Sequence, residues 1–446
     1  MILHAETALL PQGWAQDVRI RIEHGRIAEV TAGVPGRGHG AILPAPVNLH
    51  SHTFQRAMAG MTEGRTAGQD SFWTWRALMY RFLERLSPED VQAIAAQAMV
   101  EMAESGFAAV CEFHYLHHPV GGGTYADPAE MSGRVAAAAA ETGLGLTHLP
   151  VIYEQGGVDG RALAGGQLRF GSGPEVFARV LDGAGRALAG LPDAVLGVAP
   201  HSLRAVSRAT LGRVAGMTAG PVHIHIAEQV AEVVEVQAAW GARPVDWACA
   251  NLPLDARWCL IHATQMTPAE TAALARTGAV AGLCPVTEAN LGDGIFDGPG
   301  WLAAGGAFGV GTDSNVRISL PEELRLLEYS QRFAQKARAV MADHRSTGRL
   351  LWEEAATGGA RAAGRASGRI AVGQWADVLA LDTADLRLEG LAGDQLLDAC
   401  LFAGRDGLVT DLWSAGRHIV QHGRHIARAA VEARFRATLR RLRDSL

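Results

Sequence analysis

The chain has 446 residues, which is more than one hydrophobic core usually spans, so we expect one large domain accompanied by a smaller one. Hydrophobic residues make up 48% of the sequence and charged residues 19%, a balance that excludes a disordered chain. The net charge is -6 and no basic run is dense enough to bind nucleic acid, so we expect a small-molecule substrate.

The first residues lack the basic flank, the apolar core and the cleavage site of a secretion signal. No apolar stretch reaches the ~20 residues that a membrane helix requires. Five cysteines without a CxxC pair are typical of reduced, buried thiols rather than of disulfides or a thiolate metal site. We therefore expect a cytoplasmic protein with no membrane partner. The cysteines are Cys111, Cys249, Cys259, Cys284 and Cys400.

Alternating apolar and polar residues predict short β-strands at both ends of the chain. Residues 17–30 have the pattern of a hairpin with a glycine at the turn. Three later segments repeat this pattern: 376–382, 408–413 and 416–425. Because a single hairpin is not stable alone, the two ends should combine. We expect residues 1–45 and 366–425 to form one small composite β-sandwich domain of antiparallel strands.

Between these ends, apolar strand-like runs alternate with alanine-rich helical segments. Eight such runs predict an α/β fold, a (β/α)8 barrel of the TIM type, over residues 46–365. Catalytic residues of such barrels lie at the carboxyl ends of the strands, so the residues that follow each run are candidates for a site. The runs lie near 41–49, 108–115, 144–153, 194–200, 221–227, 257–263, 279–284 and 307–312.

The helices carry clear boundary signals. Ser87 is expected to cap a helix that has a proline in its first turn and ends at Gly106. The segment from Thr267 to Gly278 repeats this plan. Residues 426–446 have apolar side chains at helical spacing and predict a C-terminal helix that packs on the barrel or on a second subunit.

A histidine pair, His50 and His52, follows the first run. Residues i and i+2 of a strand share a face, so both imidazoles could point into the barrel mouth and bind one metal ion. The pair alone is a weak signal, because it could equally consist of two polar loop residues after Pro44 and Pro46. Its weight comes from the residues at the ends of later strands.

His223 and His225 in the fifth run also share a strand face, so their spacing does not decide which of them would bind a metal. Glu228, just beyond the strand, favours His225, because its carboxylate could move a proton beside the metal without being a ligand. His223 is then better explained as a packed or supporting histidine.

His262 and Asp313 follow the sixth and eighth runs and complete a set of imidazoles and a carboxylate, which suits zinc and also iron(II). A bound ion would lower the pKa of a water toward ~7. Asp313 could then ligate the metal and accept the proton of the water, and His262 could stabilise the oxyanion. Singly, Asp313 could be a turn residue and His262 a core histidine, but together they predict a hydrolytic metal site.

This order of residues resembles the amidohydrolase superfamily, and the resemblance covers nearly the whole chain. It implies the barrel and the composite sandwich domain. The fourth run ends in APHSLRA, without the bridging carbamylated lysine of the two-metal members, and the HxxE after the fifth run is the deaminase variant. The resemblance therefore implies one metal ion and the release of ammonia. We expect the ion to be divalent, zinc in preference to iron(II).

Longer segments resemble, within this superfamily, the formimidoylglutamate deiminase family. They are NLHSHTFQRAMAGMTE, DSFWTWRALMYRFLERLSPE, AVCEFHYLHH, HSLRAV, VHIHIAEQ and LCPVTEANLGDGIF. The resemblance implies the hydrolysis of N-formimino-L-glutamate to N-formyl-L-glutamate and ammonia, a step of histidine degradation. The chain departs from the family's pattern chiefly at Pro285, Val286 and Asn315, which could tune specificity.

A glutamate substrate requires side chains that bind carboxylates, and arginine is the best suited. Arg204, after the fourth run, and Arg76 are the candidates, although Arg76 could instead be an exposed helix residue. The resemblance adds Gln55, Tyr115 and His201 to the same pocket. Tyr115 could equally be a core aromatic.

The connection 53–86 is rich in aromatic residues and exceeds the usual loop length, so we expect it to cover the barrel mouth or to add a helix outside it. Two other functions stay open. One is deamination of another amidine or of a purine-type substrate on the same scaffold, and the other is a non-catalytic metal-binding barrel. The C-terminal helix and the habit of the superfamily predict a homodimer.

Overall fold

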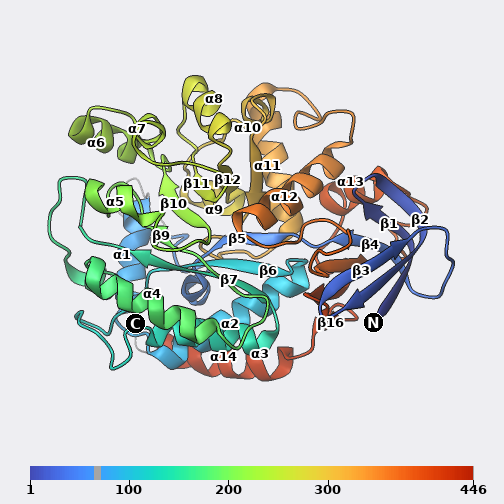
Figure 1. Cartoon of the computed structure of the whole chain (residues 1–446), viewed down its shortest axis with the longest axis horizontal. Coiled ribbons are helices and arrows are strands. Elements are labelled where there is room, and N and C mark those ends of the chain that lie inside the picture. The colour runs from blue at the N-terminus through green and yellow to red at the C-terminus, as the bar shows by residue number, and fades with distance from the viewer. Residues whose placement is uncertain (65–71, 445–446) are drawn as a thin grey trace.

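The computed structural model describes residues 1–64 and 72–444, with the backbone alone for 72–77. A barrel of parallel strands surrounded by helices forms the larger part of the molecule, and a β-sheet domain stands at one side of it (Figure 1). Over the described ranges, none of the helices combines the length and the apolar character needed to span a membrane.

Parallel strands in two hydrogen-bonded sheets form the barrel. They are β5 (Val47–Ser51), β6 (Ala109–His114), β7 (Gly145–Ile152), β8 (Val195–Leu196), β9 (Ala199–Pro200), β10 (Val222–Ile226), β11 (Trp258–His262), β12 (Val280–Leu283) and β13 (Ala307–Val310). The sheets have the orders β5-β6-β7-β8, with β9 also beside β7, and β10-β11-β12-β13. Parallel bridges from Val198 to Val222 and from Ser51 to Asp313 close the ring. With β8 and β9 as two parts of one strand, the predicted (β/α)8 barrel is confirmed.

The prediction of a single strand over residues 41–49 was wrong. Its first half belongs to β4 (His39–Pro44) of the small domain and its second half to β5 of the barrel. Pro46 has no backbone N–H, so one ladder cannot continue through it. The N–H of Ala45 donates instead to the carbonyl oxygen of Asp377, and the chain passes from one domain to the other at this point.

The predicted helix boundaries are confirmed. The Ser87 hydroxyl accepts the N–H of Asp90 and the Asp90 carboxylate accepts the N–H of Ser87, so α2 (Pro88–Ser105) begins with a capping box. Gly106 ends this helix with a φ of 109°. Thr267 forms the same box at α8 (Pro268–Thr277).

The other helices of the barrel domain lie between its strands or follow the last one. They are η1 (Thr53–Met58), α1 (Phe72–Leu83), α3 (Glu130–Thr142), η2 (Gly165–Arg169), α4 (Pro174–Leu188), α5 (Arg208–Val214), α6 (Val230–Trp240), α7 (Pro244–Asn251), α9 (Pro285–Leu291), α10 (Gly298–Ala303), α11 (Leu320–Gln335) and α12 (Thr347–Ala362).

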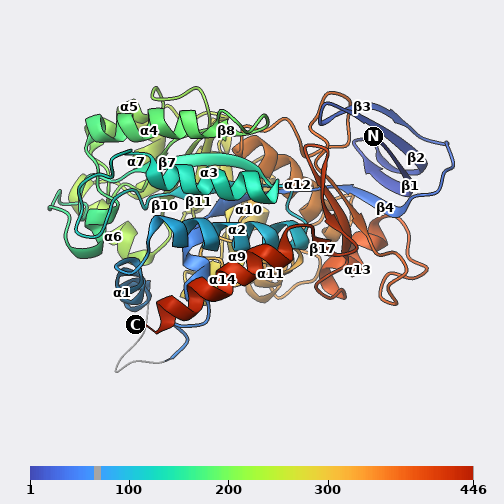
Figure 2. The ribbon, with the colours of Figure 1, turned by 90° about the horizontal axis from the view of Figure 1, so that it is seen from below.

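The C-terminal segment forms α14 (Arg428–Arg443), which runs along α2 on the surface of the barrel (Figure 2). Val431 and Leu442 are buried, and Phe435 and Leu439 are partly buried against the core. The predicted helix is therefore confirmed, and its apolar stripe packs on the barrel.

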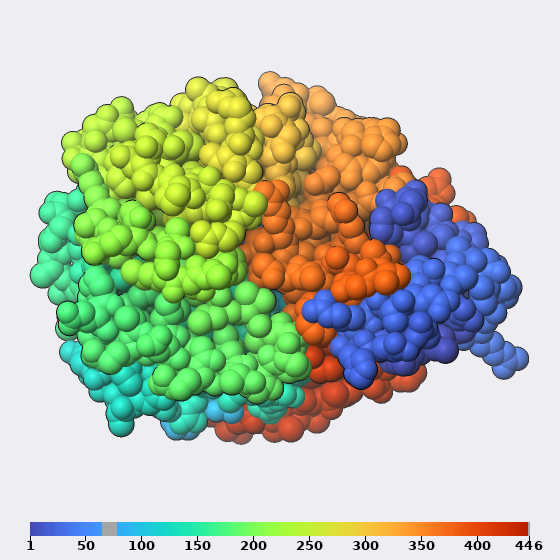
Figure 3. All heavy atoms as spheres, in the orientation of Figure 1, coloured from blue at the N-terminus to red at the C-terminus, as the bar shows by residue number. Residues whose placement is uncertain are grey.

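Strands from the N-terminal and the C-terminal parts of the chain form the small domain. These two parts lie side by side on the molecular surface (Figure 3). The strands are β1 (Ile2–Leu10), β2 (Gly13–Glu23), β3 (Arg26–Thr31), β4, β14 (Val378–Leu381), β15 (Val409–Ser414), β16 (Arg417–Gln421) and β17 (Arg424–His425), and α13 (Asp394–Phe402) lies between β14 and β15. Their order is β17-β16-β15-β14-β4-β1-β2-β3, and Ile42 of β4 pairs with Ala380 of β14.

One pair in this sheet departs from the predicted antiparallel arrangement, because β1 and β4 run parallel. The segment between β3 and β4 carries the chain back across β2 to the far side of β1, and a parallel pairing requires such a crossover. The hairpin pattern of 17–30 is confirmed by the antiparallel pairing of β2 with β3.

A buried ion network joins the small domain to the barrel. The guanidinium of Arg365 donates to Asp377 at 2.6 and 3.0 Å and to Asp193 Oδ2 at 2.8 Å. Arg417 of β16 donates to both oxygens of Asp193 at 2.7 and 2.8 Å. Although burial raises the pKa of Asp193, the two arginines lower it overall. Each buried charge in the network is therefore matched.

Candidate metal centre and active site

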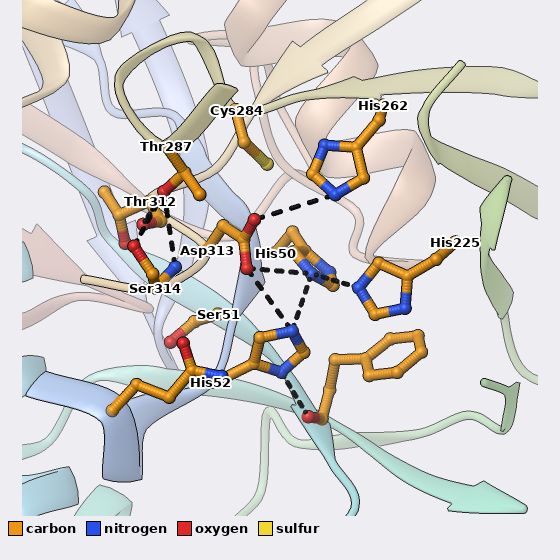
Figure 4. A network of polar contacts seen from close by, with 12 residues as sticks. His50, Ser51, His52, His225, His262, Cys284, Thr287, Thr312, Asp313 and Ser314 are labelled. Atoms are coloured by element: carbon orange, nitrogen blue, oxygen red, sulfur yellow. Dashed lines mark hydrogen bonds and ion pairs between the residues drawn. The ribbon is translucent and has the colours of Figure 1, made fainter. Parts of the chain in front are cut away.

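The predicted ligands meet at the carboxyl end of the barrel. His50 and His52 lie at the end of β5, His225 on β10 and Asp313 just after β13, while His262 ends β11. All five side chains are buried, and they point toward one another (Figure 4). Four distant segments of the chain therefore bring these groups into one cluster.

Three imidazole nitrogens of the cluster face each other. Nε2 of His50 lies 3.2 Å from Nε2 of His52 and 3.1 Å from Nε2 of His225. Nδ1–H of His52 donates to the carbonyl oxygen of Phe113 at 2.9 Å, and Nδ1–H of His225 to that of His201 at 3.0 Å. Burial lowers the pKa of His52 to about 3 and that of His50 and His225 well below the ordinary value. The rings are therefore neutral, and His52 and His225 turn unprotonated Nε2 atoms to the centre.

This arrangement fits a divalent metal ion. Nε2 of His50 can donate to only one of the two acceptor nitrogens that face it, and within residues 1–64 and 72–444 its Nδ1 has no hydrogen-bond partner. Oδ1 of Asp313 adds a further acceptor, 3.3 Å from Nε2 of His52 and 3.6 Å from Nε2 of His50. Lone pairs this close repel unless a cation lies between them. Ligands at ~2.0–2.2 Å in a tetrahedral zinc site would themselves lie about 3.3 Å apart.

The structure places His225, and not His223, in the cluster. Nε2–H of His223 donates to the carbonyl oxygen of Ala362 at the end of α12, at 2.8 Å. Both side chains share a strand face, but they lie at different depths, and sequence spacing carries no information about depth.

His262 lies beside the cluster among three carboxylates. Its Nε2 is 3.6 Å from Oδ2 of Asp313 and 3.8 Å from Oε1 of Glu228, and its Nδ1 is 3.1 Å from Oε1 of Glu288. Burial alone would lower its pKa, but the carboxylates raise the pKa to about 10. Burial likewise raises the pKa of Asp313 to about 7, against the attraction of His262. Groups able to give and take protons therefore stand next to the metal ligands.

Two buried amides hold the loop with Asp313, a role that sequence reasoning did not assign to either of them. The side chain of Asn48 donates to the Thr312 hydroxyl at 2.7 Å and accepts the Thr312 N–H at 3.0 Å. Asn315 donates to the carbonyl oxygens of His52 and Asp313 at 3.2 and 3.0 Å. The sequence did contain a signal for this role, since one asparagine shortly precedes the first ligand and another shortly follows the last. A buried amide needs several hydrogen-bond partners, so an asparagine beside a ligand can hold the ligand's backbone in place.

Of the three departures from the family pattern, Asn315 contacts the metal ligands. Pro285 and Val286 begin α9 and are not among the described residues that line the cavity presented below. The expectation that these two tune specificity therefore has no contact to support it.

Left-handed backbone gathers at the strand ends of the site. Ala227, His262, Ala263, Asp313 and Asn315 have φ between 44° and 69°. Residues with a Cβ adopt this region at a cost of roughly 1–3 kcal/mol, and such strain persists where the surroundings hold it. Here it directs the side chains of His262 and Asp313 toward the cluster.

The cluster opens into a cavity that its own side chains help to line. Gln55, Tyr115, His201 and Arg204 line it together with the cluster, where the resemblance expected them. The side-chain amide of Gln55 donates to the Tyr115 hydroxyl at 2.6 Å. Nε of Arg204 is buried and has no hydrogen-bond partner in the described part of the chain, so the guanidinium retains a donor for a ligand.

Arg76 belongs to α1, but its side chain lies outside the described residues. Two later residues of the same helix, Met79 and Tyr80, line the cavity. The connection 53–86 therefore reaches the barrel mouth rather than packing only outside it.

Comparison with known proteins identifies the class to which this fold and site belong. The model of the amidohydrolase family matches residues 41–419, and the model described as formimidoylglutamate deiminase HutF, N-terminal domain, matches residues 1–39. The chain belongs to the amidohydrolase family.

Individual relatives narrow the class further. The chain is 50% identical over 434 residues, 95% of each chain, to formimidoylglutamate deiminase of Pseudomonas aeruginosa. The crystal structure of an amidohydrolase from Brucella melitensis has 47% identity and a TM-score of 0.95 over 99% of both chains. A zinc-bound adenosine deaminase from Xanthomonas campestris shares the fold at 22% identity and a TM-score of 0.84, over 99% of this chain and 98% of that one. The resemblance to the formimidoylglutamate deiminase family is thereby confirmed.

Proposed function

We propose that this protein is a metal-dependent hydrolase that converts N-formimino-L-glutamate and water into N-formyl-L-glutamate and ammonia, a step of histidine degradation. The observation that carries the proposal is the convergence of three imidazole nitrogens and Asp313 at the floor of one cavity, with Glu228 and Arg204 in its wall. The identity to formimidoylglutamate deiminase of P. aeruginosa supports the choice of substrate.

One divalent ion would be held by His50, His52, His225 and Asp313. Zinc is preferred, because nitrogen and carboxylate ligands suit it, and iron(II) is the alternative. When bound, such an ion supplies a water activated for attack at neutral pH. Asp313 accepts the proton that the attacking water gives up. The buried position of this carboxylate, beside His262, allows the proton to move on.

Glu228 and His262 act on the reacting carbon and its leaving nitrogen. Both protons that turn the imine nitrogen into ammonia come from the water. Glu228 passes the first to this nitrogen when the C–O bond forms, and the second leaves the hydroxyl group of the tetrahedral carbon, through Asp313, as the C–N bond breaks and the formyl group forms. Nε2–H of His262 donates a hydrogen bond to the oxygen added to that carbon. Because the cavity excludes most water around these groups, their charges act more strongly than they would in solvent.

The glutamate part of the substrate presents two carboxylates, and arginine binds each in a bidentate fashion. We assign this role to Arg204 and Arg76. Nε of Arg204, which finds no hydrogen-bond partner among the residues that the structure describes, supports the assignment of Arg204. Gln55, Tyr115 and His201 complete the substrate pocket by hydrogen bonding and contact.

An ammonia-release assay on the metal-reconstituted protein tests the proposal. N-formimino-L-glutamate should release one ammonia per N-formyl-L-glutamate, while guanine and adenosine should not react, because neither offers two carboxylates to Arg204 and Arg76. Release from a purine alone would favour the rival deaminase. Bound metal without ammonia from any of these substrates would favour a non-catalytic barrel.

The proposal extends to a homodimer that works in the cytoplasm. The mass of one chain is 47.1 kDa, so light scattering on the purified protein should give about twice this value. A mass of one chain would contradict the dimer and leave the proposed reaction unaffected.

A further inference from the structure

Within the described residues, Nδ1 of His262 forms one hydrogen bond, and its partner is Glu288. It lies in the first turn of α9 and is 5% exposed. Its Oε1 accepts from Nδ1–H of His262 at 3.1 Å and from the backbone N–H of Cys284 at 2.9 Å. One carboxylate oxygen thus ties the His262 ring to the start of a helix.

This bond determines which edge of the His262 ring faces the cavity. A ring nitrogen that donates to a carboxylate carries a proton, so Nδ1 is protonated and directed away from the cluster. Nε2 then points at Glu228 and Asp313. The φ of 69° at His262 sets where the side chain starts, and Glu288 sets how its ring turns.

His262, Cys284 and Glu288 also place three ligand atoms close enough to hold a second metal ion. The hydrogen bonds account for the cluster without one, because Oε1 of Glu288 already accepts two protons. In addition, burial raises the pKa of Cys284 well above its usual value, which opposes the thiolate that a metal requires.

We propose that Glu288 is a positioning residue, whose carboxylate holds the His262 ring with Nδ1–H toward α9 and Nε2 toward the substrate. The consequence for turnover rests on the proposed function, in which Nε2–H of His262 contacts the reacting atoms. The orientation of the ring does not depend on that function and is tested separately.

Glu323 provides a matched control. Its carboxylate is fully buried, and its Oε2 accepts the N–H of Val286 in the same first turn of α9, at 2.9 Å. The polar partners of His262 in the described part of the chain are Glu228, Glu288 and Asp313, and Glu323 is not one of them. Replacing either glutamate by leucine therefore removes one acceptor from the start of α9, but only Glu288→Leu also removes the partner of His262.

Steady-state kinetics with N-formimino-L-glutamate measures the consequence. Partners that orient a metal-bound histidine are worth ~10–100-fold in activity, and we expect the partner of His262 to matter at the upper end of this range. Glu288→Leu should therefore lower kcat by about 100-fold, with KM and metal content within about twofold of wild type. Glu288→Gln retains an acceptor oxygen and should recover at least about tenfold of this loss, and Glu323→Leu should keep kcat within about threefold.

Equal losses of kcat in Glu288→Leu and Glu323→Leu would overturn the proposal, because the carboxylate would then serve only α9. Equal losses in Glu288→Leu and Glu288→Gln would overturn it as well, since the acceptor would not be the cause.

Nuclear magnetic resonance of protein labelled with 15N in its histidine rings gives a readout without turnover. Wild-type protein, with and without metal, should show a slowly exchanging Nδ1–H signal that His262→Asn abolishes, Glu288→Leu removes and Glu323→Leu preserves. Absence of this signal from wild type would overturn the proposal even if every variant failed to fold. If wild type released no ammonia, the proposed function would fail while this spectrum still decided the orientation.

Discussion

Glu228 lies beside the metal cluster, with its Oε1 3.8 Å from Nε2 of His262, and is not one of the metal-ligand candidates among the described residues. Glu228→Gln keeps the volume of the side chain and removes its capacity to carry a proton. We expect kcat to fall by ~10²–10⁴-fold, the usual contribution of a general acid or base, with unchanged metal content. Ammonia release and elemental analysis on the same sample check this, and near-normal turnover would contradict the role of Glu228.

The two histidines of β10 should separate metal binding from packing. His225→Asn removes an imidazole of the cluster and should weaken metal affinity by more than about 100-fold, since even residues that only support ligands are worth ~10–100-fold. His223→Asn loses the bond to Ala362 and should keep the metal while lowering stability. Metal content after dialysis against a zinc buffer distinguishes them, and equal loss from both variants would refute the assignment.

The histidines and Asp313 were predictable from the sequence because each stands at the end of an apolar run, and barrel topology brings such ends together. Glu288 was not predictable in the same way. It lies within a helix, and its role depends on a contact with His262, 26 residues earlier. The positive φ of His262 has no local sequence signal either, because only packing holds a residue with a Cβ in that region.

At the scale of single elements, α2 depends on its capping box. Ser87→Ala removes the acceptor for the N–H of Asp90 and should lower the free energy of unfolding by about 1 kcal/mol. Ser87→Asp restores a good cap and should stay within a few tenths of a kcal/mol of wild type. Urea midpoints of the three proteins measure this effect, and identical midpoints for alanine and serine would show that the cap contributes nothing.

Helix ends and strand runs were accessible from the sequence because capping and alternation act within a few residues. The parallel pair β1–β4 was not, since its register is set by a crossover of the whole meander. The division of residues 41–49 between two strands was predictable only in part. Pro44 and Pro46 were visible in the sequence, but the Asp377 carbonyl that draws Ala45 into the small domain comes from the other end of the chain.

At the scale of the whole molecule, we expect the ion network around Arg365 to stabilise the contact between the small domain and the barrel. Arg365→Leu leaves Asp377 buried without its guanidinium partner, and breaking a buried pair in this way costs about 3–5 kcal/mol. Arg19→Leu, which breaks a half-exposed pair with Glu29, should cost at most about 1 kcal/mol. Unfolding in urea followed by tryptophan fluorescence compares them, and equal losses would exclude a special role for the network.

The same network should make stability depend on acid. The pKa of Asp193 is lower in the folded protein than its ordinary value of 3.8, so its contribution is fully present above that value and is lost as the pH falls through the lower, folded value. The difference in urea midpoint between wild type and Arg365→Leu should therefore shrink below about pH 4. A difference that stayed constant down to pH 2 would rule out this carboxylate as the source.

The pairing of β4 with β14 has a consequence for the order in which the molecule is made. The partner of residues 41–44 is the segment 378–381, so a growing chain displays the edge of β4 long before its neighbour exists. At ~5–20 residues per second, synthesis of the intervening chain takes roughly 15–70 s. Throughout that time the edge of β4 that will pair with β14 stays unpaired. The whole barrel is therefore synthesised before the sheet that begins the protein can be completed.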